Sequence, residues 1–135
     1  MHRRLDPPGW APAKGYANGV VAEGRMVFLG GHIGWNGAQR FETDDFVGQV
    51  RQTLENIVAV LAEAGAEPAH LVRLTWYIKD KREYLERLPE VGQVYRAVLG
   101  RNFPAMAMVQ VADLIEDRAK VEIEATAVIP AEGAR

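Results

Sequence analysis

The chain has 135 residues, a net charge of −2 and no cysteine. This length fits a single domain over residues 1–135, and the mixed charges give no electrostatic footprint for nucleic acid or an anionic membrane. The lack of cysteine excludes disulfides and thiolate chemistry, and the three histidines lack metal-ligand spacing, so no metal is predicted. No apolar stretch reaches the roughly 20 residues of a membrane span, and a cytoplasmic protein is the default prediction.

The secondary structure is predicted from turn residues and hydrophobic spacing. Residues 1–14 contain three prolines and are expected to form an extended arm. Apolar residues recur with helical spacing over 44–64 and 83–99, whereas β-branched and aromatic residues at 71–78 are typical of a strand. In chain order, the expected elements are a hairpin of strands at 19–22 and 26–29, a helix at 44–64, a strand at 71–78, a helix at 83–99, and strands at 105–111 and 120–129. Pro89 suits a first helical turn and is an alternative start for the helix at 83–99.

This β-β-α-β-α-β-β order predicts an α+β sandwich, with a mixed sheet and two helices on one face. The last strand alternates, so Glu122 and Glu124 share one face and apolar residues share the other. The sheet face without helices needs cover, and Met106 and Met108 are expected to make part of it apolar. Association of several copies through that face is the natural consequence.

Five short segments carry a family resemblance, in the order Gly15-Tyr16, Gly30-Gly31-His32-Ile33, Tyr77-Ile78-Lys79-Asp80, Asn102-Phe103-Pro104-Ala105 and Val121-Glu122-Ile123-Glu124-Ala125. Together they resemble the Rid family, the reactive intermediate deaminases also called YjgF-type or RidA-like proteins. The resemblance implies a chorismate-mutase-like fold and a homotrimer that binds small molecules in clefts between subunits. It also implies hydrolysis of an enamine or imine to a ketone and ammonia, with no cofactor.

The resemblance assigns roles to three residues. Glu122 matches the acid that holds the attacking water, Tyr16 matches a tyrosine of the cleft, and Gly31 matches a glycine whose backbone N–H lies near the substrate. His32 could act as a general acid at neutral pH. Structural interpretations stay open beside these roles: a polar residue on a half-exposed strand for Glu122, a packing residue for Tyr16 and a loop histidine for His32.

Four positions depart from the deaminating members. Gly30 stands in place of a serine, Gly92 stands near an asparagine, and Met106 and Met108 replace an arginine and a cysteine. An arginine holds a carboxylate by two parallel hydrogen bonds, so Met106 favours a less acidic, more apolar substrate. Met106, Met108, Gly30, Gly31 and His32 are the predicted substrate-binding residues. Arg101 or Arg118 could supply a replacement cation.

Two functions therefore compete. The first is hydrolytic deamination of reactive enamines or imines by Glu122 and Tyr16, with a non-standard substrate. The alternative is a trimer of the same fold that binds a small ligand or an interaction partner without catalysis. A ribonuclease-like activity, attributed to some members of the family, is a weaker third possibility because the chain is slightly acidic.

Overall fold

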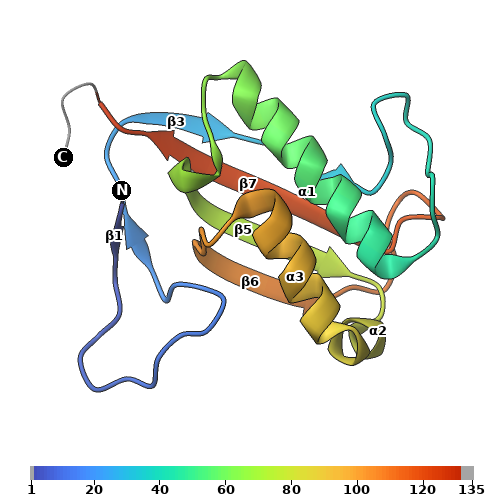
Figure 1. Ribbon diagram of the computed structural model, residues 1–135, viewed down its shortest axis with the longest axis horizontal. Helices are drawn as coiled ribbons and strands as arrows, with labels where there is room; N and C mark the ends of the chain where they lie inside the picture. Colours follow the sequence, from blue (N-terminus) through green and yellow to red (C-terminus); the bar gives the residue numbers. More distant parts are fainter. Residues whose placement is uncertain (1, 132–135) are drawn as a thin grey trace.

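The computed structural model describes residues 2–131, and it contains one main sheet covered by helices on one face (Figure 1). The sheet has the strand order β3-β7-β5-β6, with β4 also paired to β7. Only the β5–β6 pair is parallel; the pairs that involve β7 are antiparallel. The strands are β3 (Arg25–Phe28), β4 (His32–Ile33), β5 (Leu71–Ile78), β6 (Ala105–Gln110) and β7 (Val121–Ile129). The predicted α+β class with a mixed sheet is confirmed.

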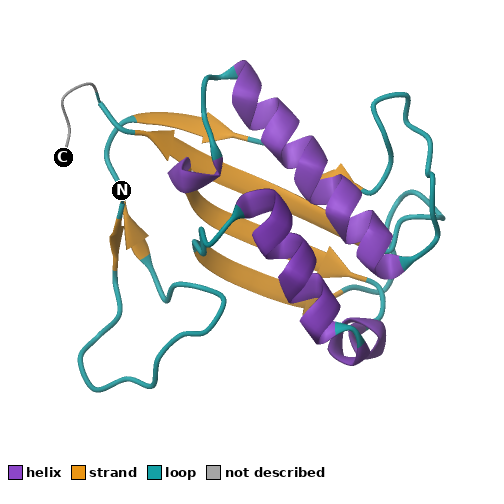
Figure 2. Cartoon of the chain, viewed as in Figure 1, coloured by secondary structure: helices purple, strands orange, loops and turns teal. Residues whose placement is uncertain are grey.

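The helices α1 (Phe46–Glu63) and α3 (Leu88–Leu99) lie across the sheet (Figure 2). The helix predicted at 83–99 is two helices, because α2 (Lys81–Glu86) ends before Arg87, and α3 begins next to the alternative start predicted at Pro89. Pro89 explains the break, since a proline inside a continuous helix would clash with the carbonyl four residues earlier and lacks an N–H. In the first turn of α3 it costs nothing. A short 3₁₀ helix, η1 (Pro68–His70), precedes β5.

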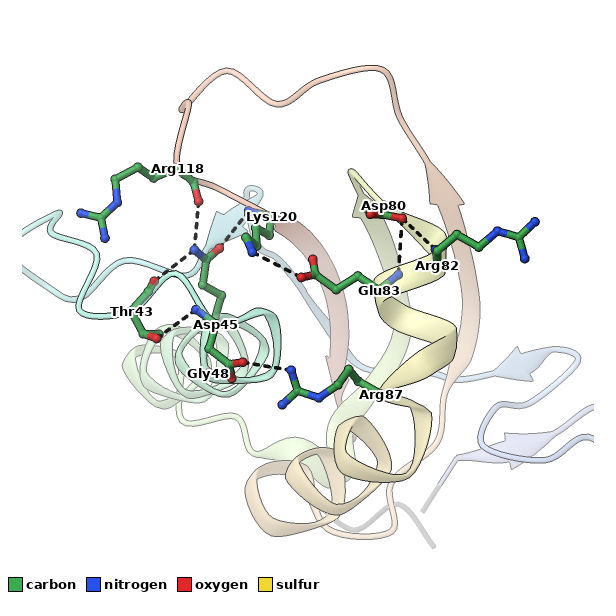
Figure 3. Close-up of polar contacts among 10 residues, drawn as sticks. Thr43, Asp45, Gly48, Asp80, Arg82, Glu83, Arg87, Arg118 and Lys120 are labelled. Atoms are coloured by element: carbon green, nitrogen blue, oxygen red, sulfur yellow. Dashed lines mark hydrogen bonds and ion pairs between the residues drawn. The ribbon is translucent and has the colours of Figure 1, made fainter.

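Ionic contacts near the start of α1 join α1 to α3 and α2 to the segment before β7 (Figure 3). Asp45 is the N-cap of α1 and accepts a hydrogen bond from the backbone N–H of Gly48 at 2.9 Å. Its other oxygen accepts from the guanidinium of Arg87 at 3.0 Å, at the start of α3. On α2, Glu83 pairs with Lys120 at 3.3 Å, just before β7. These contacts fix the helix pair over the sheet.

The N-terminal segment departs from the predicted hairpin. β2 (Val20–Val21) pairs with β1 (Arg3–Arg4) in a separate two-stranded sheet, while β3 pairs with β7. Gly24 accounts for the difference: its φ is +145°, and a Cβ there would lie 1.9 Å from the carbonyl oxygen of Ile129. The backbone thus passes very close to the end of β7 at Gly24, and β2 leaves the main sheet.

Strand register shows that Met106 and Met108 do not lie on the open face of the sheet, so that prediction is wrong. They pair with Leu74 and Trp76 of β5, which are buried under the helices. Residues paired across neighbouring strands point to the same face, so both methionines lie on the helix side. They were misplaced because the alternation of a strand does not say which face is covered.

The open face carries other apolar side chains instead. Phe28 and Met26 of β3 are 70% and 60% exposed, and Val109 of β6 is 47% exposed. These side chains are available for contact with a second molecule.

Among the helices of the described chain, none is long and apolar enough to cross a bilayer.

Candidate active site

Two of the predicted site residues, Gly31 and Glu122, meet on the open face of the sheet. The short strand β4 pairs with β7, so that Ile33 lies opposite Glu122 and the preceding Gly31 lies against its side chain. A Cβ built on Gly31 would be 2.0 Å from Oε2 of Glu122 and 2.9 Å from its Cδ. The carboxylate therefore occupies space that any side chain at position 31 would need. A glycine at position 31 is therefore required for the close approach of the Glu122 carboxylate.

His32 follows Gly31 in the chain and pairs with Ile123, whose buried side chain lies on the helix side, so the register turns the imidazole away from the open face, although the charge of Glu122 still acts on it. Burial lowers the pKa of His32 below its usual 6.5, and the nearby carboxylate of Glu122 offsets part of this by raising it. A lowered pKa leaves the imidazole neutral at pH 7, with one ring nitrogen protonated and the other not. A neutral imidazole can both donate and accept a hydrogen bond.

The two carboxylates of β7 differ in how they are bonded. Glu124 accepts a hydrogen bond from the hydroxyl of Tyr77 at 2.7 Å, which raises the pKa of that tyrosine. Glu122 accepts no hydrogen bond and makes no ion pair with other residues of the described range 2–131. Glu124 thus has a structural partner, whereas the half-buried Glu122 keeps its acceptor capacity for water or a ligand.

A second group of predicted residues lines a groove on the helix side, at the edge strand β6. This groove has a volume of about 610 Å³. Met106 and Met108 lie beside Trp76, which is stacked on Tyr95 with ring centroids 6.4 Å apart. Tyr95 is stacked in turn on Phe103. The full lining is Lys14, Gly15, Tyr16, Trp76, Tyr84, Leu88, Val91, Gly92, Tyr95, Arg96, Arg101, Phe103, Met106 and Met108.

Tyr16 reaches this groove because the segment before β2 runs alongside β6. The neighbouring residue Ala17 forms a parallel bridge with Ala105, and its N–H donates to the carbonyl of Pro104 at 3.0 Å. The guanidinium of Arg4 donates to the carbonyl of Tyr16 at 3.1 Å. The side chain of Tyr16 is 42% exposed, so it borders the groove rather than the core.

Of the two arginines considered as replacement cations, the structure places only Arg101 at the groove. Arg118 pairs with Asp44 at 2.9 Å and its guanidinium lies 5.3 Å from the ring centre of Phe41, in a separate hollow. Two further cations at the groove, Lys14 and Arg96, were missed from the sequence. The spacing of Arg96 four residues after Gly92 was the available signal, because such residues are neighbours on a helix.

The two groups of residues lie on opposite faces of the sheet in one chain. Glu122 pairs with Tyr77 of β5 on the open face, whereas Met106 pairs with the buried Leu74 on the helix side. Gly31 accompanies Glu122, and Tyr16 accompanies the methionines. One chain therefore does not bring Tyr16 and Glu122 to the same ligand.

The fold and these two clusters define a small α+β protein with a ligand-sized groove beside an edge strand, and comparison with known proteins gives its family. The family model described as Endoribonuclease L-PSP matches residues 8–129. A RutC family protein of Haemophilus influenzae is 36% identical over 109 residues, which are 81% of this chain and 83% of that protein. A 2-iminobutanoate/2-iminopropanoate deaminase of Salmonella typhimurium is 34% identical over 116 residues, covering 84% of this chain and 86% of the relative.

A solved structure agrees with these sequence matches. It is the crystal structure of YyfB from Yersinia pestis, a protein of unknown function in the conserved Rid protein family. The two folds superpose with a TM-score of 0.84 at 28% identity, over 95% of this chain and 98% of that chain. This chain belongs to the Endoribonuclease L-PSP family, the family of the YjgF and Rid proteins.

Proposed function

We propose that this protein hydrolyses reactive imines or enamines to a carbonyl compound and ammonia, in clefts shared between the subunits of a homotrimer. One observation carries the proposal: the carboxylate of Glu122 lies directly against the backbone of Gly31, with no other partner in the described chain. A carboxylate and a backbone donor side by side suit the attack of water on a C=N carbon. The deaminases among the relatives support the reaction class.

The chemistry follows from what each group can donate or accept. The carboxylate of Glu122 takes a proton from water as the water oxygen bonds to the imine carbon. The backbone N–H of Gly31 stabilises charge on the substrate, and the proton that Glu122 has taken passes to the nitrogen. The new hydroxyl group then gives up its proton to the nitrogen as its oxygen forms the carbonyl, the C–N bond breaks, and the nitrogen leaves as ammonia. The overall change is water plus imine to carbonyl plus ammonia.

In this proposal, a second copy of the chain supplies the other wall of the catalytic site. Tyr16, Met106 and Met108 line the groove on the helix side of β6, where Glu122 of the same chain does not reach. The exposed Phe28 and Met26 on the open face support burial of that face against a neighbouring copy. In the proposed trimer, Glu122 of one subunit works on a substrate held in the groove of the next.

The groove favours a substrate with an apolar body. Its lining is mainly aromatic and aliphatic, and the thioethers of Met106 and Met108 present a polarisable apolar surface. A groove of about 610 Å³ has room for more than a one- or two-carbon side chain. We therefore propose imines that are larger and more apolar than the 2-iminobutanoate and 2-iminopropanoate named for the deaminase relatives.

The alternative is a trimer that binds a small ligand without hydrolysing it. The departures at Gly30, Gly92, Met106 and Met108 favour it, because four groove and loop positions differ from the deaminating pattern. Ribonuclease activity, suggested by the description of the family model, is a weaker candidate because the net charge of −2 does not favour RNA binding.

Ammonia release tests the proposal. Imines generated in solution would be offered to the wild type and to Glu122→Gln, whose amide cannot take a proton from water. We expect the rate to fall roughly a hundredfold or more. Glu124→Gln is the matched control on the same strand and face, and it should retain most of the activity because Glu124 already bonds to Tyr77. Wild-type protein that releases no ammonia above background would favour the binding alternative.

A further inference from the structure

Arg96 lies over the backbone of Gly92 on α3. A Cβ on Gly92 would be 3.2 Å from Nη1 of Arg96 and 3.9 Å from its Cζ. Helical side chains point toward the N-terminus, so the residue at i+4 covers the surface of residue i. The missing side chain at Gly92 leaves the guanidinium room to lie at the groove, which both residues line. A larger residue at position 92 would displace it.

The groove carries positive charge without compensation. Lys14, Arg96 and Arg101 line it, and no aspartate or glutamate does. Within residues 2–131, none of the three makes an ion pair with a carboxylate. Cations beside an apolar wall are poorly screened and attract an anion more strongly than they would on an open surface.

A buried donor at the same groove also lacks a partner. Trp76 is 2% exposed, and its indole Nε1 is without a hydrogen-bond partner in the described chain. Its strand neighbour Met108 offers only a weak thioether acceptor. Buried N–H groups are normally bonded. This nitrogen has almost no accessible surface, so an acceptor in the groove does not reach it in this arrangement, and Trp76 contributes only apolar surface to the wall of the groove.

We propose that Arg96, placed by Gly92, selects substrates with an anionic group in this groove. The inference rests on the proposed function in taking the groove as the substrate site, and it specifies the substrate class. The ligand is an organic anion whose apolar body packs on Trp76, Tyr95 and the methionines. The cation thus comes from helix α3 rather than from position 106 of strand β6.

Binding of an unreactive probe tests this separately from catalysis. Benzoate and benzamide have nearly the same shape, but only benzoate is charged. Each would be titrated into the full-length protein while the indole N–H resonance of Trp76, assigned with Trp76→Phe, is followed by nuclear magnetic resonance. We expect benzoate to bind roughly tenfold to a hundredfold more tightly than benzamide and to shift the Trp76 resonance.

Two variants test Arg96 itself. In Arg96→Met and in Gly92→Asn, which keeps the arginine but fills its space, the preference for benzoate should fall to about twofold or less. Arg82→Met removes an exposed arginine of α2 that does not line the groove, and it should keep the full preference. An unchanged preference in both groove variants would overturn the inference, as would a wild type that binds the two probes equally.

The outcomes separate this inference from the proposed function. A benzoate preference that depends on Arg96, in a protein that hydrolyses no imine, would exclude the proposed deaminase activity and still support selection of anions by Arg96. Equal turnover of charged and uncharged imines, together with equal binding of the two probes, would support the proposed deaminase activity and overturn the role of Arg96.

Discussion

Replacing Gly31 by alanine should damage the site while leaving the fold almost intact. The added Cβ would lie 2.0 Å from Oε2 of Glu122, and ordinary contact begins at 3.4 Å, so the carboxylate must move by about 1.4 Å. The clash is with the end of a flexible side chain, and Gly31 does not have a positive φ. The movement therefore costs little stability. It does displace the proposed base from the proposed position of water.

The expected loss follows from that distance. Misplacing a catalytic group by about 1 Å costs on the order of a hundredfold in rate. We therefore expect kcat for imine hydrolysis to fall about a hundredfold in Gly31→Ala, with Tm lowered by only a few degrees. Ammonia release and thermal unfolding, measured on the same preparation, would show the two effects.

Two other glycines separate this clash from the effect of a methyl group. At Gly30 and at Gly37 a Cβ would meet nothing within 4 Å. Gly37→Ala, remote from the site, should leave kcat unchanged, and Gly30→Ala should cost far less than Gly31→Ala although it is next in sequence. A kcat for Gly31→Ala within threefold of the wild type would refute the assignment of Glu122 as the base.

Three further predictions concern stability and assembly. Asp45→Ala should lower the free energy of unfolding by about 1–2 kcal/mol, mainly through the lost N-cap, while Asp45→Asn keeps the cap acceptor and should cost less in denaturant titrations. Burial lowers the pKa of His32 in the folded chain below 6.5, so the unfolded chain binds protons more readily. The free energy of unfolding should therefore fall as the pH drops below 6.5, and a smaller fall in His32→Asn would confirm that His32 causes it. Phe28→Asp should convert the proposed trimers to monomers in sedimentation runs without loss of helical signal, because this side chain is 70% exposed in one chain. Trimers that persist in this variant would show that assembly uses another surface.

The sequence predicted those elements whose hydrophobic pattern fits only one structure. The run Leu71–Ile78 is a strand with the predicted bounds, and α1 begins and ends within two residues of the prediction. The prediction of a hairpin was wrong because a glycine after a short strand indicates a turn, whether or not the strands on its two sides pair with each other. Gly24 shows the difference only through its contact with Ile129, which is distant in sequence.

The sequence indicated the candidate residues one at a time but not their arrangement. The closeness of Gly31 and Glu122 depends on the pairing of β4 with β7, and this two-residue strand gives no periodic signal. The expectation of a less acidic substrate rested on Met106 alone. It could not include Arg96, whose position depends on the space over Gly92. The charge of the groove depends on which helices and strands lie next to one another in the fold, and no single residue of the sequence shows this.

The central claim is that each site is shared between two subunits, and mixed trimers test it most directly. Glu122→Gln removes the proposed base and Met108→Trp fills the groove; each variant alone should be inactive. After the two are unfolded together and refolded at equal amounts, a site is intact when one half comes from each kind of subunit. That gives about one half times one half, or roughly a quarter, of wild-type activity. Activity near a quarter is the predicted result, and a mixture as inactive as its components would contradict the shared site.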